Sequence, residues 1–357
     1  MKNIKFRKNI EELKWYSSWK WEFNGKAKIF LDTNENPYDL WGLENNRYPD
    51  PMAIELKKEL IKVKKEQFWV NLDINNIMID NWSDNIIDLL VRIFCEPWED
   101  SLAYFSPTFG MYKVAADINN IWIKEFILDE NFEIKNQDLE KIYSLSTESF
   151  NPLKLFFICN PNNPSWNITA NLNLIEEILQ KFNWIVVIDE AYIDFYPEYS
   201  AIKLLEKYNN LVILQTFSKL WWLAWVRCWM AFSSPQIIEK LNIIKAPYNV
   251  NSLTQKVVLK QLKNSEIIFD IKKKIILERE KLKINLEKLN FIEKVYNSNS
   301  NFLLVKFQDW QKVFEYLKEN WIIVRNFSQN KYTKNCLRIS IGTEKENKTV
   351  LEVLKNY

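Results

Sequence analysis

Histidine is absent from this chain of 357 residues, and glycine occurs only four times. Soluble proteins use glycine at about 7% of their positions, so residues that adopt left-handed backbone conformations without strain are scarce here. Imidazole is the side chain most often used for acid–base catalysis near neutral pH and for binding metals, so mechanisms that need it are excluded. The sequence predicts no metal site.

Paired cysteine motifs, long apolar runs and an excess of one charge are also missing. The four cysteines form no CxxC pair and lie in or beside apolar runs, which predicts buried free thiols: Cys95, Cys159, Cys228 and Cys336. No run reaches the roughly 18 apolar residues that a membrane span needs, and residues 1–14 lack the apolar core of a secretion signal. A net charge of +2 gives no basis for binding nucleic acid. We therefore expect a cytoplasmic protein that binds neither nucleic acid nor membrane.

The middle of the chain alternates short apolar runs with amphipathic segments. The apolar runs predict five strands: Ile77–Ile79, Leu102–Phe105, Leu155–Cys159, Ile185–Ile188 and Leu211–Leu214. The segments between them predict helices: Ile54–Lys65, Ser83–Phe94, Met111–Ala116, Leu172–Phe182 and Ile202–Tyr208. This alternation is typical of an α/β domain in which helices cover both faces of a mainly parallel central sheet.

After Pro247 the pattern changes to that of a smaller α+β domain. One long charged helix is predicted from about Ser252 to Leu289. Shorter elements follow it: strands at Phe302–Phe307, Ile322–Arg325 and Leu337–Ile341, and helices at Gln311–Glu319 and Lys345–Leu354. We expect three parts, namely an N-terminal segment (residues 1–45) that packs with the small domain, a large domain (46–250) and the small domain (251–357).

Polar motifs follow three of the predicted strands. They are Asn160-Pro-Asn-Asn-Pro-Ser165, Asp189-Glu-Ala-Tyr192 and Thr216-Phe-Ser-Lys219, and Arg227 lies eight residues beyond the lysine. Each motif alone is common in loops and turns. Open α/β sheets bind ligands at the carboxyl ends of their strands, so the three motifs are expected to converge on one crevice.

The residue types in this crevice suit pyridoxal 5'-phosphate (PLP). A lysine that forms a Schiff base must be partly desolvated and close to the cofactor's carbonyl, which is the role expected of Lys219. A buried carboxylate keeps the pyridine nitrogen protonated, and Asp189 is placed for this. Asn163 and Tyr192 can donate hydrogen bonds to the phenolate oxygen, and Phe109 can lie on the ring.

The phosphate of such a cofactor needs hydroxyl groups, a cation and the backbone N–H groups of a helix N-terminus. Ser218 and Arg227 supply the first two, and Thr216 begins the same motif. Ser83 and Asp84 open a predicted helix and supply the third. Histidine is not needed in any of these roles.

These segments together resemble the fold-type I PLP-dependent aminotransferases of class II, and within them the histidinol-phosphate aminotransferase family. The likeness runs from Leu31-Asp-Thr-Asn-Glu-Asn-Pro37 to Leu337-Arg-Ile-Ser-Ile-Gly342. It passes through Arg47-Tyr-Pro49, Ser83-Asp-Asn-Ile-Ile-Asp-Leu-Leu90 and Pro107-Thr-Phe-Gly-Met-Tyr112. The lysine and aspartate motifs identify the wider class, and the first and last segments point to the branch.

The resemblance implies a large PLP-binding domain, a small domain and a homodimer whose active sites lie at the subunit interface. Tyr48 would reach the phosphate of PLP in the neighbouring subunit. Arg338 and Arg325 would bind the anionic end of the substrate, and Asn34 would join the substrate-binding residues. The implied reaction is ping-pong transamination between L-histidinol phosphate and 2-oxoglutarate, with Lys219 moving the proton.

Three alternatives remain open at this point. The first is an aminotransferase for aromatic or varied amino acids on the same scaffold. The second is a PLP lyase such as the threonine-phosphate decarboxylases, which share these motifs. The third is an inactive relative.

The third alternative arises because tryptophan stands where the family has glycine, at nine of sixteen tryptophans: Trp19, Trp69, Trp82, Trp98, Trp166, Trp222, Trp225, Trp229 and Trp321. An indole provides neither the left-handed backbone nor the close approach that glycine allows. Two explanations compete. Either the loops have been rebuilt around real tryptophans, or the codon is UGA, which some bacterial codes read as glycine.

Overall fold

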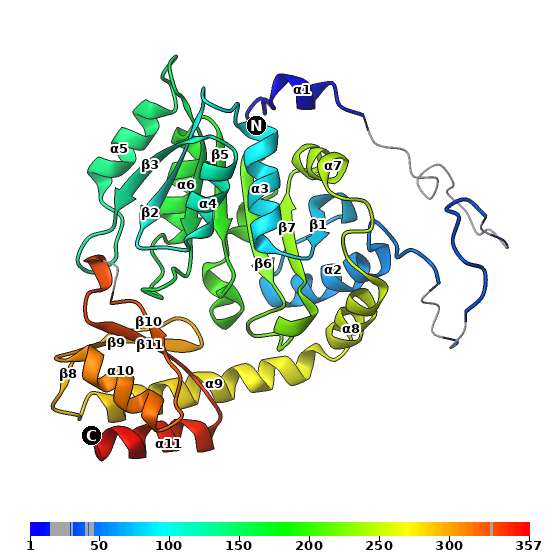
Figure 1. The fold of residues 1–357 in the computed structure, drawn as a ribbon. Helices are drawn as coiled ribbons and strands as arrows, with labels where there is room; N and C mark the ends of the chain where they lie inside the picture. Colours follow the sequence, from blue (N-terminus) through cyan, green and yellow to red (C-terminus); the bar gives the residue numbers. More distant parts are fainter. Residues whose placement is uncertain (15–28, 30, 40–41, 43–45, 329–330) are drawn as a thin grey trace.

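A seven-stranded sheet forms the centre of the molecule (Figure 1). The computed structural model describes residues 1–357 except 15–28, 30, 40–41, 43–45 and 329–330. The strand order is β1-β7-β6-β5-β4-β2-β3, and β7 runs antiparallel to both of its neighbours. The strands are β1 Ile77–Asp80, β2 Ser101–Ser106, β3 Trp122–Ile127, β4 Leu153–Cys159, β5 Ile185–Asp189, β6 Leu211–Thr216 and β7 Trp229–Ser233.

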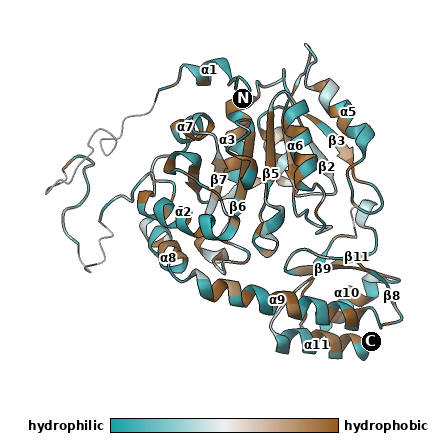
Figure 2. Ribbon diagram, turned by 180° about the vertical axis from the view of Figure 1, so that it is seen from behind, coloured by the Kyte–Doolittle hydropathy of each residue, from teal (hydrophilic) through white to brown (hydrophobic). Residues whose placement is uncertain are grey.

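Helices cover both faces of this sheet, which confirms the predicted α/β class (Figures 1 and 2). They are α2 Ile54–Phe68, α3 Ser83–Phe94, α4 Met111–Ile118, α5 Asn136–Leu145, α6 Leu172–Lys181 and α7 Pro235–Ile244. Every residue of β5 and β6 is buried, as expected for strands covered on both sides. The five predicted strands are present, whereas β3, β7, α5 and α7 were not predicted.

The predicted helix Ile202–Tyr208 is wrong, since only a 3-10 turn, η5, forms at Ala201–Leu204. The N–H groups at its start are bound by side chains. That of Ala201 donates to Glu190, and that of Ile202 donates to Ser200. These bonds hold the segment against the end of β5, and a single turn forms there in place of the predicted helix.

A second sheet of four strands, in the order β10-β11-β9-β8, lies beside the first. Its elements are β8 Ile292–Val295, β9 Phe302–Phe307, β10 Arg325–Asn326, β11 Cys336–Ser340, α10 Trp310–Glu319 and α11 Glu344–Lys355. The long helix α9, Ser265–Leu286, runs from the large domain to this sheet (Figure 1). A separate apolar cluster that includes Leu303, Val305 and Leu337 forms the core of the small domain.

Two predictions for this region are corrected. The helix expected from Ser252 to Leu289 is two helices, α8 Ser252–Leu262 and α9, because Asn264 leaves the helical conformation at φ −119° and ψ 35°. The strand expected at Ile322–Arg325 begins only at Arg325. The N–H group of Ile322 instead bonds the carbonyl of Leu317 at 2.8 Å, so this apolar run completes the end of α10.

The first ten residues pack against the large domain. Ile4, Phe6 and Ile10 are buried in the main core. The backbone N–H of Arg7 bonds the carbonyl of Ile93 in α3 at 2.9 Å, and Figure 1 places the N-terminus beside this helix. These N-terminal residues thus cover apolar residues of α3 and α7, which the sequence pattern did not predict.

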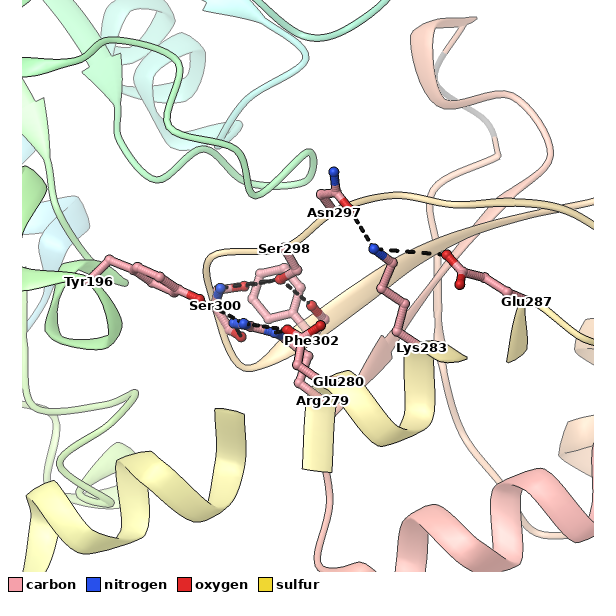
Figure 3. Close-up of polar contacts among 9 residues, drawn as sticks. All are labelled: Tyr196, Arg279, Glu280, Lys283, Glu287, Asn297, Ser298, Ser300 and Phe302. Atoms are coloured by element: carbon pink, nitrogen blue, oxygen red, sulfur yellow. Dashed lines mark hydrogen bonds and ion pairs between the residues drawn. The ribbon is translucent and has the colours of Figure 1, made fainter. Parts of the chain in front are cut away.

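One buried arginine joins the two sheets (Figure 3). Arg279 in α9 donates to the backbone carbonyl of Ser300 at 3.0 Å and to the hydroxyl of Tyr196 at 2.7 Å. Tyr196 follows β5 in the large domain, whereas Ser300 lies two residues before β9. Glu280 pairs with the same guanidinium at 2.7 Å. Arg279 therefore links the segment after β5 in the large domain to the segment before β9 in the small one.

All four cysteines are buried and free, as predicted. Within the described part of the chain, no helix is long and apolar enough to cross a bilayer.

Candidate active site

The carboxyl ends of β4, β5 and β6 bring the three polar motifs to one edge of the main sheet. The backbone N–H of Asn160 bonds the carbonyl of Asp189, and that of Glu190 bonds the carbonyl of Leu214, both at 2.8 Å. These bonds continue the parallel ladder past the strand ends. The loops that carry Asn163, Tyr192 and Lys219 therefore start side by side.

Asp189, the last residue of β5, is only 2% exposed. Its carboxylate accepts a hydrogen bond from the Tyr112 hydroxyl at 2.7 Å and one from the backbone N–H of Ala191 at 3.1 Å. Burial raises the pKa of Asp189, and these two donors oppose the rise. A buried carboxylate in this state is stabilised by a cation placed next to it, and a protonated pyridine nitrogen is such a cation.

Lys219 lies half-buried beside Tyr192, with Nζ 5.2 Å from the centre of the ring. Burial lowers the pKa of Lys219, and the positive charge of Arg338 lowers it further. The carboxylate of Asp189 opposes these effects. A lowered pKa increases the fraction of neutral amine, which is the form that attacks a carbonyl.

The small sheet contributes Arg338 to the same place. Its Nη1 atom donates to Oδ1 of Asn163 at 3.1 Å, and its guanidinium lies 4.8 Å from the centre of the Phe302 ring. Phe302 in turn contacts Tyr192 edge to face, with the ring centres 5.0 Å apart. The Nε atom of Arg338 is buried and has no hydrogen-bond partner among the described residues, so it is available to a ligand.

Arg325 lies directly opposite Arg338 across the β10–β11 pair. Side chains in this relation are close neighbours, and like charges there destabilise the sheet. Burial lowers the pKa of Arg338, and the charge of Arg325 lowers it further. An anion bound between the two guanidinium groups would remove this repulsion.

Hydroxyl, cationic and backbone groups gather near the lysine in a way that suits a phosphate. The Oγ atom of Ser218 and the Nε atom of Arg227 are buried without a partner among the described residues. Thr216 accepts the N–H of Ser218 at 2.9 Å and so shapes the turn before the lysine. These unpartnered polar atoms are the observation that favours a bound anion here.

The N-terminus of α3 supplies backbone donors. No side chain caps this helix, and Ser83 is buried as its first residue. The Oγ atom of Ser83 donates to the carboxylate of Asp84 at 2.9 Å, so Asp84 is already held. Backbone N–H groups of this first turn, rather than the Asp84 carboxylate, are the groups suited to a phosphate.

Trp82 stands at the start of α3 in an extended conformation with φ −140°. The guanidinium of Arg227 stacks on its ring at 4.2 Å. Trp82, Trp225 and Arg227 line one cleft of about 370 Å³ together with Asn81 and Asn251. Two indoles therefore stand beside the groups that suit a phosphate.

Three further candidates are Tyr48, Asn34 and Phe109. Tyr48 stacks on Tyr248, with ring centres 4.5 Å apart, and lines a cleft of about 580 Å³ that also includes Asn34. Among the described residues, neither Lys219 nor Asp189 lines this cleft. Phe109 is half-buried and meets Tyr112 edge to face at 5.8 Å.

Two residues of the site were not assigned a role from sequence. Tyr112 ends the segment Pro107-Thr-Phe-Gly-Met-Tyr112. It lies three residues after Phe109, and this spacing at the start of a helix indicates that the two side chains are neighbours. No sequence pattern indicates Phe302. It lies in the second sheet and contacts Tyr192 and Arg338 of the site only because of how the two domains are arranged.

The fold and site define a PLP-dependent aminotransferase. The family description "Aminotransferase class I and II" matches residues 34–354. The chain is 43% identical to histidinol-phosphate aminotransferase of Parabacteroides distasonis over 100% of this chain and 99% of that protein. It is 44% identical to the same enzyme of Bacteroides thetaiotaomicron over 98% and 97% of the two chains. The chain therefore belongs to the class I and II aminotransferase family, in its histidinol-phosphate aminotransferase branch.

Solved structures show the same fold. Histidinol-phosphate aminotransferase of Clostridium acetobutylicum has a TM-score of 0.76 at 22% identity and covers 87% of this chain and 90% of its own. The enzyme of Sinorhizobium meliloti, in complex with pyridoxal 5'-phosphate, has a TM-score of 0.73 at 19% identity over 87% and 84% of the two chains. PLP, predicted from the sequence, is the cofactor of this family.

Proposed function

We propose that the chain transfers the amino group of L-histidinol phosphate to 2-oxoglutarate, giving imidazole acetol phosphate and glutamate in histidine biosynthesis. The observation that carries this proposal is full-length identity of 43–44% with relatives of that name. The arginine pair supports it. A guanidinium binds both a phosphate and a carboxylate through two parallel hydrogen bonds, so one site can accept both substrates in turn.

The residues present suit PLP. Lys219 would hold its carbonyl carbon, Asp189 its pyridine nitrogen, and Ser218 and Arg227 its phosphate. The Oγ atom of Ser218 and the Nε atom of Arg227 are buried without a partner among the described residues, and burial raises the pKa of Asp189. When bound, PLP withdraws electrons from the substrate carbon that loses its proton.

The protein's own side chains have separate tasks in the proposed reaction. The neutral amine of Lys219 would take up and return the proton of the substrate carbon. Asp189 would keep the cofactor's nitrogen protonated, and the Tyr112 hydroxyl donates to that carboxylate and fixes its orientation. Asn163 and Tyr192 would hold the cofactor by hydrogen bonds, and Phe109 would pack against it. Arg338 orients the anionic end of the substrate.

The remaining parts of the proposal concern assembly and location. A homodimer is proposed because Tyr48 and Asn34 line a cleft apart from Lys219. In this arrangement Tyr48 acts on the cofactor of the neighbouring subunit. We further propose a cytoplasmic location, which agrees with four free thiols. The domain limits at residues 46 and 251 remain part of the same proposal.

The test compares amino donors with 2-oxoglutarate as acceptor. We expect L-histidinol phosphate to exceed both L-histidinol and L-phenylalanine in kcat/KM by roughly 10- to 100-fold, because charge-assisted hydrogen bonds to the phosphate contribute about 1.5–3 kcal/mol. Equal rates for histidinol and its phosphate would contradict the assignment. Release of CO2 from threonine phosphate would instead identify a lyase.

A further inference from the structure

Five tryptophans of this chain have a left-handed backbone conformation. Their φ angles lie between 60° and 66°, at Trp69, Trp98, Trp166, Trp222 and Trp321. They are five of the twelve tryptophans that the structure describes. Only a few per cent of non-glycine residues have positive φ, mostly asparagine and aspartate, and a bulky residue there is an outlier. Such a concentration in one bulky residue type has no ordinary structural cause.

The positions are ones at which glycine is the usual residue. Trp69 ends α2, and its N–H bonds the carbonyl of Lys65 at 3.0 Å. Trp321 follows the end of α10, and its N–H bonds the carbonyl of Lys318 at 3.0 Å. Helices commonly end in this way with a left-handed glycine, which has no Cβ to meet the following carbonyl.

Four of the five side chains at these positions are mostly exposed to solvent. Trp69 is 90% exposed and Trp321 is 94% exposed. Trp98 and Trp222 are 67% and 66% exposed. Trp166 is the buried member, and its indole N–H has no hydrogen-bond partner among the described residues. Four indoles therefore face solvent, and the fifth leaves a polar group unsatisfied.

Other tryptophans of the same chain behave differently. The indole N–H of Trp184 donates to the carbonyl of Ser146 at 3.1 Å, and that of Trp221 donates to Asp194 at 3.0 Å. Trp221 is buried and Trp184 is partly buried against the main core, and neither residue has positive φ. The described tryptophans thus include some whose indole N–H is hydrogen-bonded and whose backbone is ordinary, and five whose backbone is left-handed.

We propose that the native protein carries glycine at positions 69, 98, 166, 222 and 321 and tryptophan at positions 184 and 221. The codon UGA is translated as glycine in some bacterial genetic codes and as tryptophan in others. A gene that uses UGA for glycine and UGG for tryptophan gives both kinds of position in one chain. Four glycines beside sixteen tryptophans agree with this.

The positive φ angles support glycine at these five positions independently of any likeness to the family. Of the other four positions expected from sequence, Trp82 is extended, Trp225 and Trp229 have no positive φ, and Trp19 lies outside the described residues. The conformation of the backbone therefore carries the proposal for five positions and not for nine.

Position 222 has a consequence for the lysine loop. The N–H of Leu223 bonds the carbonyl of Phe217 at 3.1 Å and closes the turn that carries Lys219. Residue 222 passes through φ 66° directly before this bond. Glycine adopts that conformation without strain, so the loop around Lys219 forms from ordinary backbone geometry.

Peptide sequencing by mass spectrometry tests the proposal on protein isolated from its natural source. Trypsin cleaves after Lys219 and Arg227, so a single peptide contains positions 221 and 222. We expect tryptophan at 221 followed by glycine at 222, with glycine also at 69, 98, 166 and 321. Tryptophan at any of these five positions overturns the assignment there, and tryptophan at 222 overturns the proposal. Glycine at 184 or 221 would equally contradict it.

A pair of recombinant variants tests the physical argument separately. Trp69→Gly and Trp69→Ala both remove an exposed indole, but only glycine removes the Cβ that opposes positive φ. The urea midpoint of the full chain should be higher for Trp69→Gly than for Trp69→Ala. Equal midpoints would show that the backbone is not strained and would remove the argument. Trp184→Gly is the matched control, and its midpoint should fall because a packed ring is lost.

Discussion

Arg338 and Asn163 are joined by a hydrogen bond of 3.1 Å across 175 residues of sequence. Arg338 lies on β11 of the small sheet, and Asn163 lies in the loop after β4 of the large one. The bond brings a guanidinium to the edge of the main sheet where Lys219 and Asp189 lie. The position of the small domain therefore determines whether the site contains the guanidinium proposed to bind the anionic end of the substrate.

Replacing Arg338 by lysine should weaken substrate binding. Lysine keeps the charge but cannot make two parallel bonds to an anion, so we expect KM for histidinol phosphate and for 2-oxoglutarate to rise by about 10- to 100-fold. Steady-state kinetics with each substrate measures this. Arg92→Lys is the matched control and should leave both KM values unchanged, because Arg92 is an exposed arginine of α3 that pairs with Asp88. Unchanged KM values in Arg338→Lys would show that another group binds the anion.

Replacing Lys219 by alanine should abolish transamination. The proton transfer assigned to this amine contributes about 10²–10⁴-fold to the rate, and turnover should fall by at least that factor. The visible absorbance of lysine-bound PLP should vanish as well, while circular dichroism stays unchanged. Lys203→Ala alters an exposed lysine and should keep both signals. A persistent absorbance band in Lys219→Ala would assign the cofactor to another lysine.

Glu190 should make the protein less stable as the pH rises. Its carboxylate is 1% exposed, and burial raises its pKa to about 7 although Ser200, Gln215 and the N–H of Ala201 donate to it. Because the folded pKa lies above the unfolded value, the protonated group stabilises the fold fully at low pH. This contribution is lost as the pH rises through about 7.

Urea unfolding at pH values from about 5 to about 8, on both sides of the pKa of about 7, measures the change in the free energy of unfolding. The free energy of unfolding should fall by at most about 3 kcal/mol from this group, because a tenfold difference in proton affinity between the folded and unfolded chain corresponds to about 1.4 kcal/mol. In Glu190→Gln this part of the slope should disappear, whatever the stability of the variant at one pH. The same slope in both proteins would show that Glu190 does not titrate in this range.

Arg279 should stabilise the contact between the two sheets. Arg279→Met leaves the Ser300 carbonyl and the Tyr196 hydroxyl without their donor, so the free energy of unfolding should drop by about 3 kcal/mol. Tyr196→Phe removes only one of these bonds and should lower it by about 1 kcal/mol. Both are measured by urea unfolding. If Tyr196→Phe is as destabilising as Arg279→Met, the bond to Ser300 contributes nothing.

The large domain followed closely from sequence because its strands are continuous apolar runs. Ile185–Asp189 is such a run, and burial on both faces leaves it no other arrangement. β3 escaped prediction because Trp122–Ile127 is an edge strand with exposed and charged residues. The break at Asn264 also escaped, since the helical pattern of charged and apolar residues continues through it.

The site was predictable where its residues follow strand ends and not where it depends on domain packing. Lys219, Asp189 and Asn163 are brought to one edge by parallel strands, which a sequence pattern reveals. Phe302 and the bond between Arg338 and Asn163 depend on how the second sheet meets the first. No local pattern encodes that arrangement.

The length of α9 gives the break at Asn264 a geometric effect at the site. A helix of 22 residues is about 33 Å long at 1.5 Å per residue. Rotation of such a rod by about 5° at one end displaces the other end by about 3 Å. That displacement is as large as the distance between Arg338 and Asn163. A bend of a few degrees at residues 263–264 would thus separate Arg338 from Asn163, and the hydrogen bond from Arg279 of α9 to Tyr196 opposes such a bend.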